Sequence, residues 1–90
     1  NGSHNPIFGN TKNCRNPELS PAGSSSGSAS LIGAGGSLFG TGSDFGGSLR
    51  APAHFCGISS IKPTIGRLSD KGLQTCVPSI GLPSVPGILA

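Results

Sequence analysis

The chain has 90 residues, among them 16 glycines and 8 prolines, and it contains no tryptophan, tyrosine or methionine. Glycine buries no side chain and loses more conformational entropy on folding than other residues, so this composition argues against a complete hydrophobic core. We therefore expect either disorder or a piece of a larger domain. The formal net charge is +3, and the basic residues are scattered along the chain, which argues against a nucleic-acid-binding surface.

The cysteines and histidines form no metal-binding pattern. Cys14, Cys56 and Cys76 contain no Cys-x-x-Cys pair and have no metal-ligand spacing to His4 or His54. We expect no metal and no cofactor. The odd number of cysteines indicates reduced thiols in a protein that is not secreted, while one disulfide remains open. No apolar run approaches the roughly 20 residues of a membrane span, and no signal peptide is visible. The chain does not begin with methionine, which fits a fragment.

The first third of the chain combines a loop with a helix of small residues. Residues 1–20 read as a loop, because asparagine, proline, glycine and serine interrupt them throughout. Residues 21–27 predict a tight polar turn. A helix is predicted at 26–35, with serine or glycine as its N-cap and Gly35 and Gly36 as its stop. Each internal glycine costs about 1 kcal/mol relative to alanine, so this helix needs close packing against its neighbours.

Short elements alternate through the middle of the chain. A strand is predicted at 38–43, a turn at 44–47, a helix at 48–56 that ends before a glycine, and a strand at 58–61. Pro52 falls near the first turn of the second helix, where its missing N–H is tolerated. The alternation of helices and strands predicts the α/β class.

The last part of the chain, residues 65–90, again reads as a loop. Pro78, Pro83 and Pro86 argue against any long element there.

Two short serine motifs fit known catalytic patterns but lack the required context. Residues 23–27 match the Gly-x-Ser-x-Gly elbow, which needs a preceding strand that the proline-rich residues before it do not provide. Residues 59–62 match Ser-x-x-Lys, which needs both side chains on one helical turn. Pro63 biases Lys62 away from the helical region. We interpret both matches as chance.

A third serine follows a stretch suited to binding an anion. Successive backbone N–H groups lead into the predicted second helix and form a candidate oxyanion hole; they belong to Phe45, Gly46, Gly47 and Ser48. The hydroxyl of Ser48 would lie beside these donors. A neutral serine needs a base to become nucleophilic. Neither His4 nor His54 is well placed for that role, so these residues supply a nucleophile and donors without a base.

The motifs around these serines resemble the amidase signature family. The resemblance rests on Pro-Ala-Gly-Ser-Ser-Ser-Gly-Ser at 21–28, Gly-Ser-Asp-Phe-Gly-Gly-Ser-Leu-Arg at 42–50, Pro52, Phe-Cys-Gly at 55–57 and Lys-Pro-Thr at 62–64. It covers about half of the chain. It implies an α/β/α sandwich with a mixed sheet, of which 90 residues are only part. We expect residues 20–64 to be the signature segment of a partial amidase domain, flanked by loops and short elements at 1–19 and 65–90.

The resemblance assigns separate roles to the residues of the motifs. Ser48 would be the nucleophile, and Ser24 would carry the proton between Ser48 and a lysine. The family places a cis peptide at this second serine. The four N–H groups named above would form the oxyanion hole, while Asp44 and Arg50 would support the loop. The catalytic lysine of the family precedes this chain, so Lys62 is expected to be structural.

The flanking sequence resembles the fatty-acid amide hydrolase branch of the family, at residues 5–9, 28–39 and 67–77. This implies hydrolysis of long-chain lipid amides by an intracellular, membrane-associated protein that contacts the membrane through parts outside this chain and could form a homodimer. The alternatives are a general amidase, the glutaminase subunit of an amidotransferase, and a truncated paralogue without catalytic activity. We expect the isolated 90 residues to be inactive and poorly folded.

Two substitutions depart from the family pattern in the first serine cluster. Ala22 and Ser26 replace glycines. A positive φ at Ser26 would cost free energy, because side chains with a Cβ disfavour that region.

Overall fold

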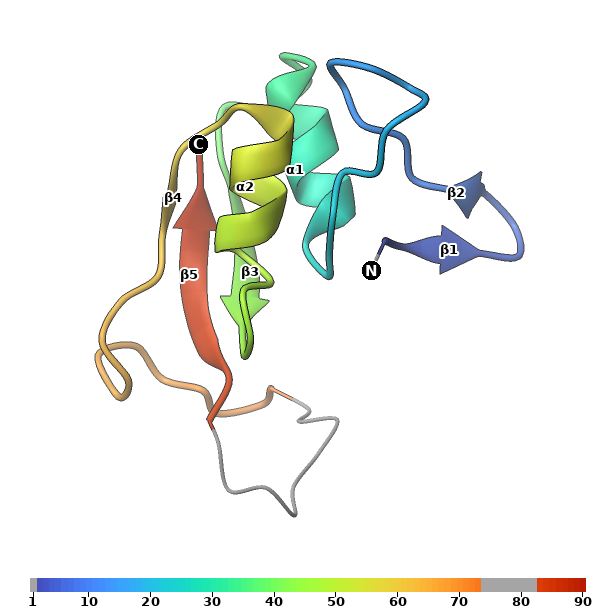
Figure 1. Ribbon diagram of the computed structural model, residues 1–90. Helices are drawn as coiled ribbons and strands as arrows, with labels where there is room; N and C mark the ends of the chain where they lie inside the picture. Colours follow the sequence, from blue (N-terminus) through green and yellow to red (C-terminus); the bar gives the residue numbers. More distant parts are fainter. Residues whose placement is uncertain (1, 74–82) are drawn as a thin grey trace.

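The computed structural model describes residues 2–73 and 83–90. It contains a small hairpin, two helices and a three-stranded sheet (Figure 1). In chain order the elements are β1 (His4–Asn5), β2 (Gly9–Asn10), α1 (Ser26–Gly33), β3 (Gly40–Asp44), α2 (Arg50–Cys56), β4 (Ser60–Ile61) and β5 (Val85–Leu89). The hairpin of β1 and β2 falls within the segment predicted as a loop.

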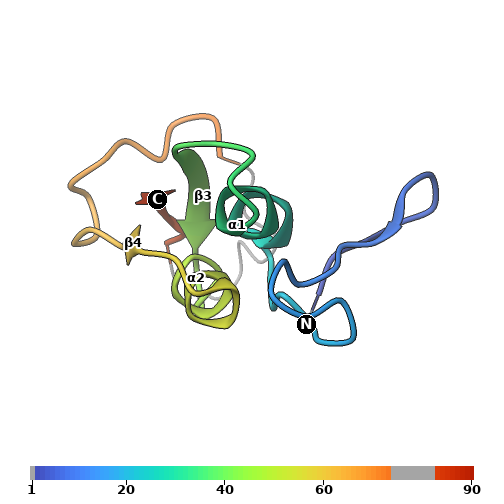
Figure 2. The ribbon, with the colours of Figure 1, turned by 90° about the horizontal axis from the view of Figure 1, so that it is seen from above.

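The three-stranded sheet has the order β3-β5-β4, so the last strand of the chain lies in the middle. All its pairs are antiparallel, with Asp44 opposite Val85 and Ser60 opposite Leu89. Both helices lie on one face of this sheet (Figure 2). Helices on a sheet confirm the predicted α/β class, and the described part forms a fragment of that architecture.

The prediction of a loop for residues 65–90 is wrong for β5. Pro86 lies opposite Ser43 of β3, and β4 pairs only with Ile88 and Leu89 further along β5. On the side of β5 that faces β4, Pro86 therefore has no described strand opposite it. Its missing N–H removes no ladder bond on that side. Pro78 lies outside the described residues.

The two helices follow their predicted positions, with shorter ends. The backbone after α1 turns at Gly35, whose φ is 77° and whose N–H donates to Ile32 O at 2.8 Å. The second helix starts two residues later than predicted and ends at Gly57, which has a φ of 66°. Only glycine adopts such left-handed conformations readily, so both helix ends are encoded in the sequence.

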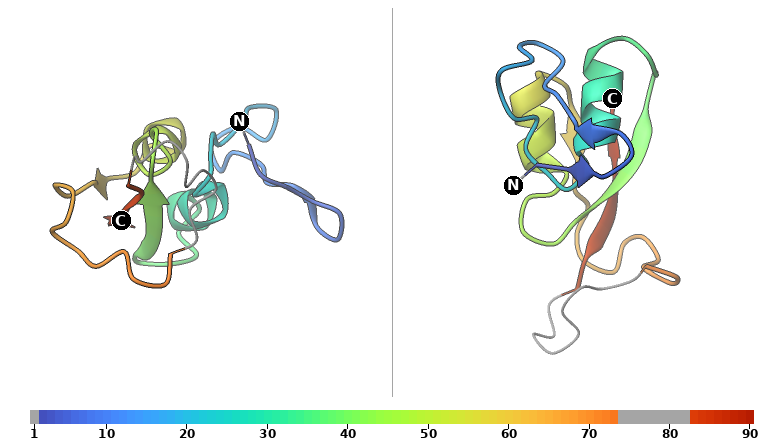
Figure 3. Two further views of the ribbon diagram at one scale, coloured as in Figure 1. Left: turned by 90° about the horizontal axis from the view of Figure 1, so that it is seen from below. Right: turned by 90° about the vertical axis from the view of Figure 1, so that its right-hand side faces the viewer.

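The buried core between the helices and the sheet is small. It consists of Ile32, Leu49, Ala53 and Leu89, with Ile58 packed against it. On the opposite sheet face, Ile61 and Ile88 pair across β4 and β5 and stay 65% and 45% exposed. The hairpin stands away from the helices and carries the exposed side chains of Ile7 and Phe8 (Figure 3). This extent of apolar exposure agrees with the expected incomplete core.

Candidate active site

Asp44, the last residue of β3, organises the loop that carries Ser48. Its carboxylate is fully buried and accepts backbone N–H bonds from Gly47 (2.8 Å), Leu49 (3.1 Å) and Arg50 (3.3 Å). It also accepts two bonds from the Arg50 guanidinium, at 3.0 and 2.9 Å. The loop between β3 and α2 is therefore wrapped around one carboxylate.

Charge and hydrogen bonding keep this carboxylate ionised. The pKa of Asp44 lies well below its usual range, chiefly because the Arg50 side chain donates to it. Burial acts in the opposite direction, and the three backbone N–H bonds add to the lowering. The same contact raises the pKa of Arg50, whose side chain remains 58% exposed.

The bonding around Asp44 divides the four candidate oxyanion donors into two groups. The N–H of Gly47 points at Asp44 Oδ1, so it is already engaged. The N–H groups of Phe45, Gly46 and Ser48 donate to no acceptor among residues 2–73 and 83–90. Gly47 has a φ of 117°, a conformation that suits glycine and lets the loop reverse direction. Three of the four candidate donors are thus unengaged within the described residues.

The first serine cluster lies directly against this loop. The N–H of Ser25 donates to the carbonyl of Ser48 at 3.2 Å, which joins segments that are more than twenty residues apart in sequence. The side chain of Ser25 also packs over Gly42 of β3, where a Cβ would overlap Ser25 Oγ. The neighbouring Ser24 is exposed and Ser48 is half-buried. The two serines singled out in the sequence therefore belong to adjoining segments.

The first cluster has the backbone geometry that the family resemblance implies, apart from one residue. The peptide between Gly23 and Ser24 is cis. Ser26 is the first residue of α1 and its Oγ donates to Ala22 O at 2.6 Å, so the expected cost of a positive φ does not arise there. It arises at Ala22, whose φ is 59°. The departure that matters for the turn is thus Ala22.

The side chains considered as a base have other partners. His4 binds Asn10 Oδ1 at 2.9 Å on the hairpin, and His54 is exposed with its ring 5.8 Å from that of Phe55. Lys62 Nζ donates to the carbonyl of Pro63 at 3.4 Å. No hydrogen bond joins a lysine or histidine to Ser24 or Ser48 within the described parts of the chain.

Sequence reasoning missed Ser25 and Gly42, the pair that brings the two clusters together. Ser25 lies between two other serines, so the sequence does not distinguish it from them. Gly42 is one of several small residues in the predicted strand at 38–43. The only available signal was that a strand containing glycine permits close backbone approach.

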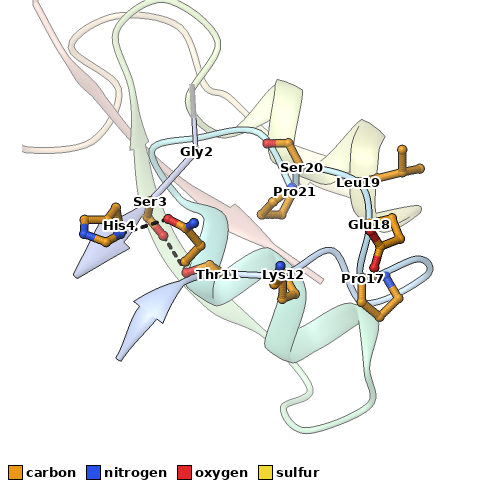
Figure 4. Close-up of a pocket in the computed structure, with 11 residues that line it drawn as sticks. Gly2, Ser3, His4, Thr11, Lys12, Pro17, Glu18, Leu19, Ser20 and Pro21 are labelled. Carbon is orange, nitrogen blue, oxygen red and sulfur yellow. Dashed lines mark hydrogen bonds between the residues drawn. The ribbon is translucent and has the colours of Figure 1, made fainter. Parts of the chain in front are cut away.

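A polar hollow of about 340 Å³ lies beside the first cluster (Figure 4). The hairpin residues Ser3 and His4 line one side, and Glu18 and Pro17 line the other. The hollow ends at Pro21 and includes neither Ser24 nor Ser48. It is therefore separate from the candidate site.

The described residues meet neither the requirements of a metal-binding cluster nor those of a membrane-spanning helix. Residues 2–73 and 83–90 contain no group of three or more side chains able to hold a metal ion. In the same ranges, no helix has the length and apolar character needed to cross a bilayer.

Comparison with known proteins supports one family. The sequence model of the family described as Amidase matches residues 2–90. Fatty-acid amide hydrolase 1 of Sus scrofa is 53% identical over 73 residues, which are 81% of this chain and 13% of that protein. A glutamyl-tRNA(Gln) amidotransferase subunit from Synechococcus sp. (strain WH7803) is 51% identical over 73 residues, 81% of this chain and 15% of that protein.

The solved structures give the same result. The structure titled "Fatty acid amide hydrolase" superimposes with a TM-score of 0.89 at 44% identity, covering 99% of this chain and 16% of that one. The chain thus spans less than a fifth of the length of each of these three proteins.

Proposed function

This chain belongs to the amidase family, and on that basis we propose that the protein containing it hydrolyses carbon–nitrogen amide bonds with Ser48 as nucleophile. One observation carries the proposal. Ser25 N–H binds the Ser48 carbonyl, which brings the two serine segments together beside three unengaged backbone donors. A hydroxyl next to such donors can form an ester intermediate whose oxyanion is stabilised as it develops.

The proposed reaction has two steps. Ser48 Oγ attacks the amide carbonyl, and its proton passes through Ser24 to a lysine outside this chain and then to the leaving amine. The carbonyl oxygen becomes an oxyanion facing the N–H groups of Phe45, Gly46 and Ser48. Water then attacks the acyl ester, which releases the acid and restores the Ser48 hydroxyl.

Asp44 and Arg50 take a supporting role in this proposal. The Asp44 carboxylate accepts bonds from the N–H groups of Gly47 and Leu49, while those of Gly46 and Ser48 make no bond to it. A fixed loop costs little reorganisation when charge develops on the substrate. Gly47 N–H contributes by holding the loop rather than by binding the oxyanion.

For the substrate we propose a fatty-acid amide. The similarity to the two fatty-acid amide hydrolases, extending over nearly the whole chain in the structural superposition, supports this class. The same similarity supports activity at an intracellular membrane surface, which the protein would contact through parts outside this chain. The nearly equal identity to the amidotransferase protein makes a glutamine-type amide the second candidate.

The test uses the full-length protein that contains these residues, assayed with a long-chain primary amide and with glutamine. We expect hydrolysis of the lipid amide, and loss of it in Ser48→Ala. Ser59→Ala is the matched control, because Ser59 is exposed and its hydroxyl has no hydrogen-bond partner among the described residues. Turnover of glutamine alone would overturn the substrate class, and full activity of Ser48→Ala would overturn the mechanism.

A further inference from the structure

The loop at residues 13–15 is fastened to the C-terminal end of α2. Asn13 Nδ2 donates to Phe55 O at 2.8 Å, and Arg15 Nε donates to Cys56 O at 3.0 Å. Arg15 also reaches Gly57 O at 3.4 Å. Carbonyls at a helix C-terminus lack intrahelical partners, so this loop satisfies them with side-chain donors. The attachment brings the side chain of Cys14 to the backbone of Cys56.

Two thiols meet at this attachment. Cys14 Sγ donates to the carbonyl of Cys56 at 3.6 Å. Both side chains pack over Gly33 of α1, where a Cβ would overlap Cys14 Sγ and lie 3.5 Å from Cys56 Cβ. Ser30 Oγ lies 3.8 Å from Cys56 Sγ. Cys56 is fully buried, Cys14 is half-buried, and both are reduced.

From this packing we propose that Cys14 and Cys56 are an oxidisable pair that closes to a disulfide on exposure to a peroxide. The Cys14 thiolate attacks one oxygen of hydrogen peroxide, the O–O bond breaks, and Cys14 becomes a sulfenic acid. The hydroxide that leaves takes up the proton lost from the Cys14 thiol and forms the first water. The Cys56 sulfur then attacks the Cys14 sulfur, forming the S–S bond and releasing the second water. The two thiols lose two electrons, which the peroxide accepts.

The surroundings of the two sulfurs support this order of events. Cys14 is the more exposed of the pair, so a small oxidant reaches it first. Burial raises the pKa of the Cys56 thiol, and the neighbouring Cys14 thiol adds to the increase, so Cys56 is the poorer first nucleophile. It is held next to the sulfenic acid and suits the second step.

The disulfide would tie together the two ends of the candidate site. The chain between Cys14 and Cys56 includes both Ser24 and Ser48. Oxidation therefore fixes the segment before the first serine to the helix after the second. Cross-linking so long a loop restricts the unfolded chain, so the oxidised protein should unfold at a higher temperature. This inference does not depend on the proposed amide hydrolysis.

The test is a peptide map of the full-length protein after exposure to hydrogen peroxide. Trypsin cuts after lysine and arginine unless proline follows, so the pair would appear as residues 13–15 joined to residues 51–67. We expect this linked peptide to weigh two hydrogens less than its parts and to vanish on reduction. The apparent Tm should rise by several degrees on oxidation and fall back on reduction.

Two variants make the result specific. Cys14→Ser should abolish both the linked peptide and the Tm increase, while Cys76→Ser should preserve them. Recovery of residues 13–15 and 51–67 as separately alkylated peptides after oxidation would overturn the proposal. A disulfide from Cys14 or Cys56 to Cys76, found instead of the Cys14–Cys56 disulfide, would also overturn the proposal. The map of the unsubstituted protein decides the question even if a variant folds poorly.

Discussion

Replacing Asp44 with asparagine should destabilise the loop that carries Ser48. The Asp44 carboxylate accepts five N–H bonds, three of them from backbone groups. An amide keeps one oxygen and turns an NH₂ group toward either Gly47 or Leu49, which leaves a buried donor without an acceptor. Each such loss costs about 1–3 kcal/mol, so we expect Asp44→Asn to lower stability by about 2–4 kcal/mol.

The ion pair itself should contribute the smaller part, because the Arg50 side chain is 58% exposed and solvent screens its charge. The assay is denaturant unfolding of the full-length protein, combined with kcat for the amide substrate. Asp70→Asn is the matched control, since Asp70 is exposed and its side chain makes no hydrogen bond in the described residues. We expect kcat to fall about 10-fold or more in Asp44→Asn, because the proposed oxyanion donors would lose their fixed positions. Wild-type stability and kcat in Asp44→Asn would refute the reasoning.

Three further predictions concern the same region. Gly42→Ala would place a methyl over Ser25 Oγ and 2.8 Å from Leu49 Cδ2, so we expect a loss of about 1–3 kcal/mol in unfolding experiments, whereas Gly27→Ala, which meets nothing within 4 Å, should be neutral or stabilising. Ala22→Gly should raise stability by about 1 kcal/mol, because Ala22 holds a φ of 59°; a decrease would contradict a strained turn. The lowered pKa of Asp44 predicts a contribution to stability that is complete above the ordinary aspartate pKa of about 4 and is lost progressively as pH falls from there toward the lowered pKa of the folded state. The Tm gap between wild type and Asp44→Asn should therefore shrink as pH falls below about 4.

The positions of the helices and of the Ser48 loop follow from local rules in the sequence. Gly35 and Gly57 mark the ends of the two helices because a left-handed residue stops a helix, and both carry positive φ. The run from Phe45 to Ser48 contains two glycines before a helix, which predicts a compact turn. These features depend only on neighbours along the chain, so one sequence suffices to place them.

The contacts between distant segments could not be predicted in the same way. The bond from Ser25 to Ser48 and the loop at residues 13–15 depend on how the helices pack. The strand β5 was missed because prolines are judged by local propensity, while the position of Pro86 beyond the end of β4 makes its missing N–H harmless. Asp44 is expected from the family resemblance to support its loop, but its hydrogen bond from Gly47 N–H depends on how the loop folds back in space.

The glycine content, which by composition argues against a folded core, has a structural role at the candidate site. Gly42 lets the first serine cluster rest on β3, and Gly33 lets Cys14 and Cys56 pack against α1. A side chain at either position would push apart segments that must touch if Ser24 is to exchange a proton with Ser48. Small residues therefore take the place of apolar bulk where backbones approach closely. It follows that catalysis should be more sensitive to an added methyl at Gly42 than to the loss of an apolar side chain of the small core. A larger loss of kcat in Leu89→Ala than in Gly42→Ala, at equal stability, would contradict this view.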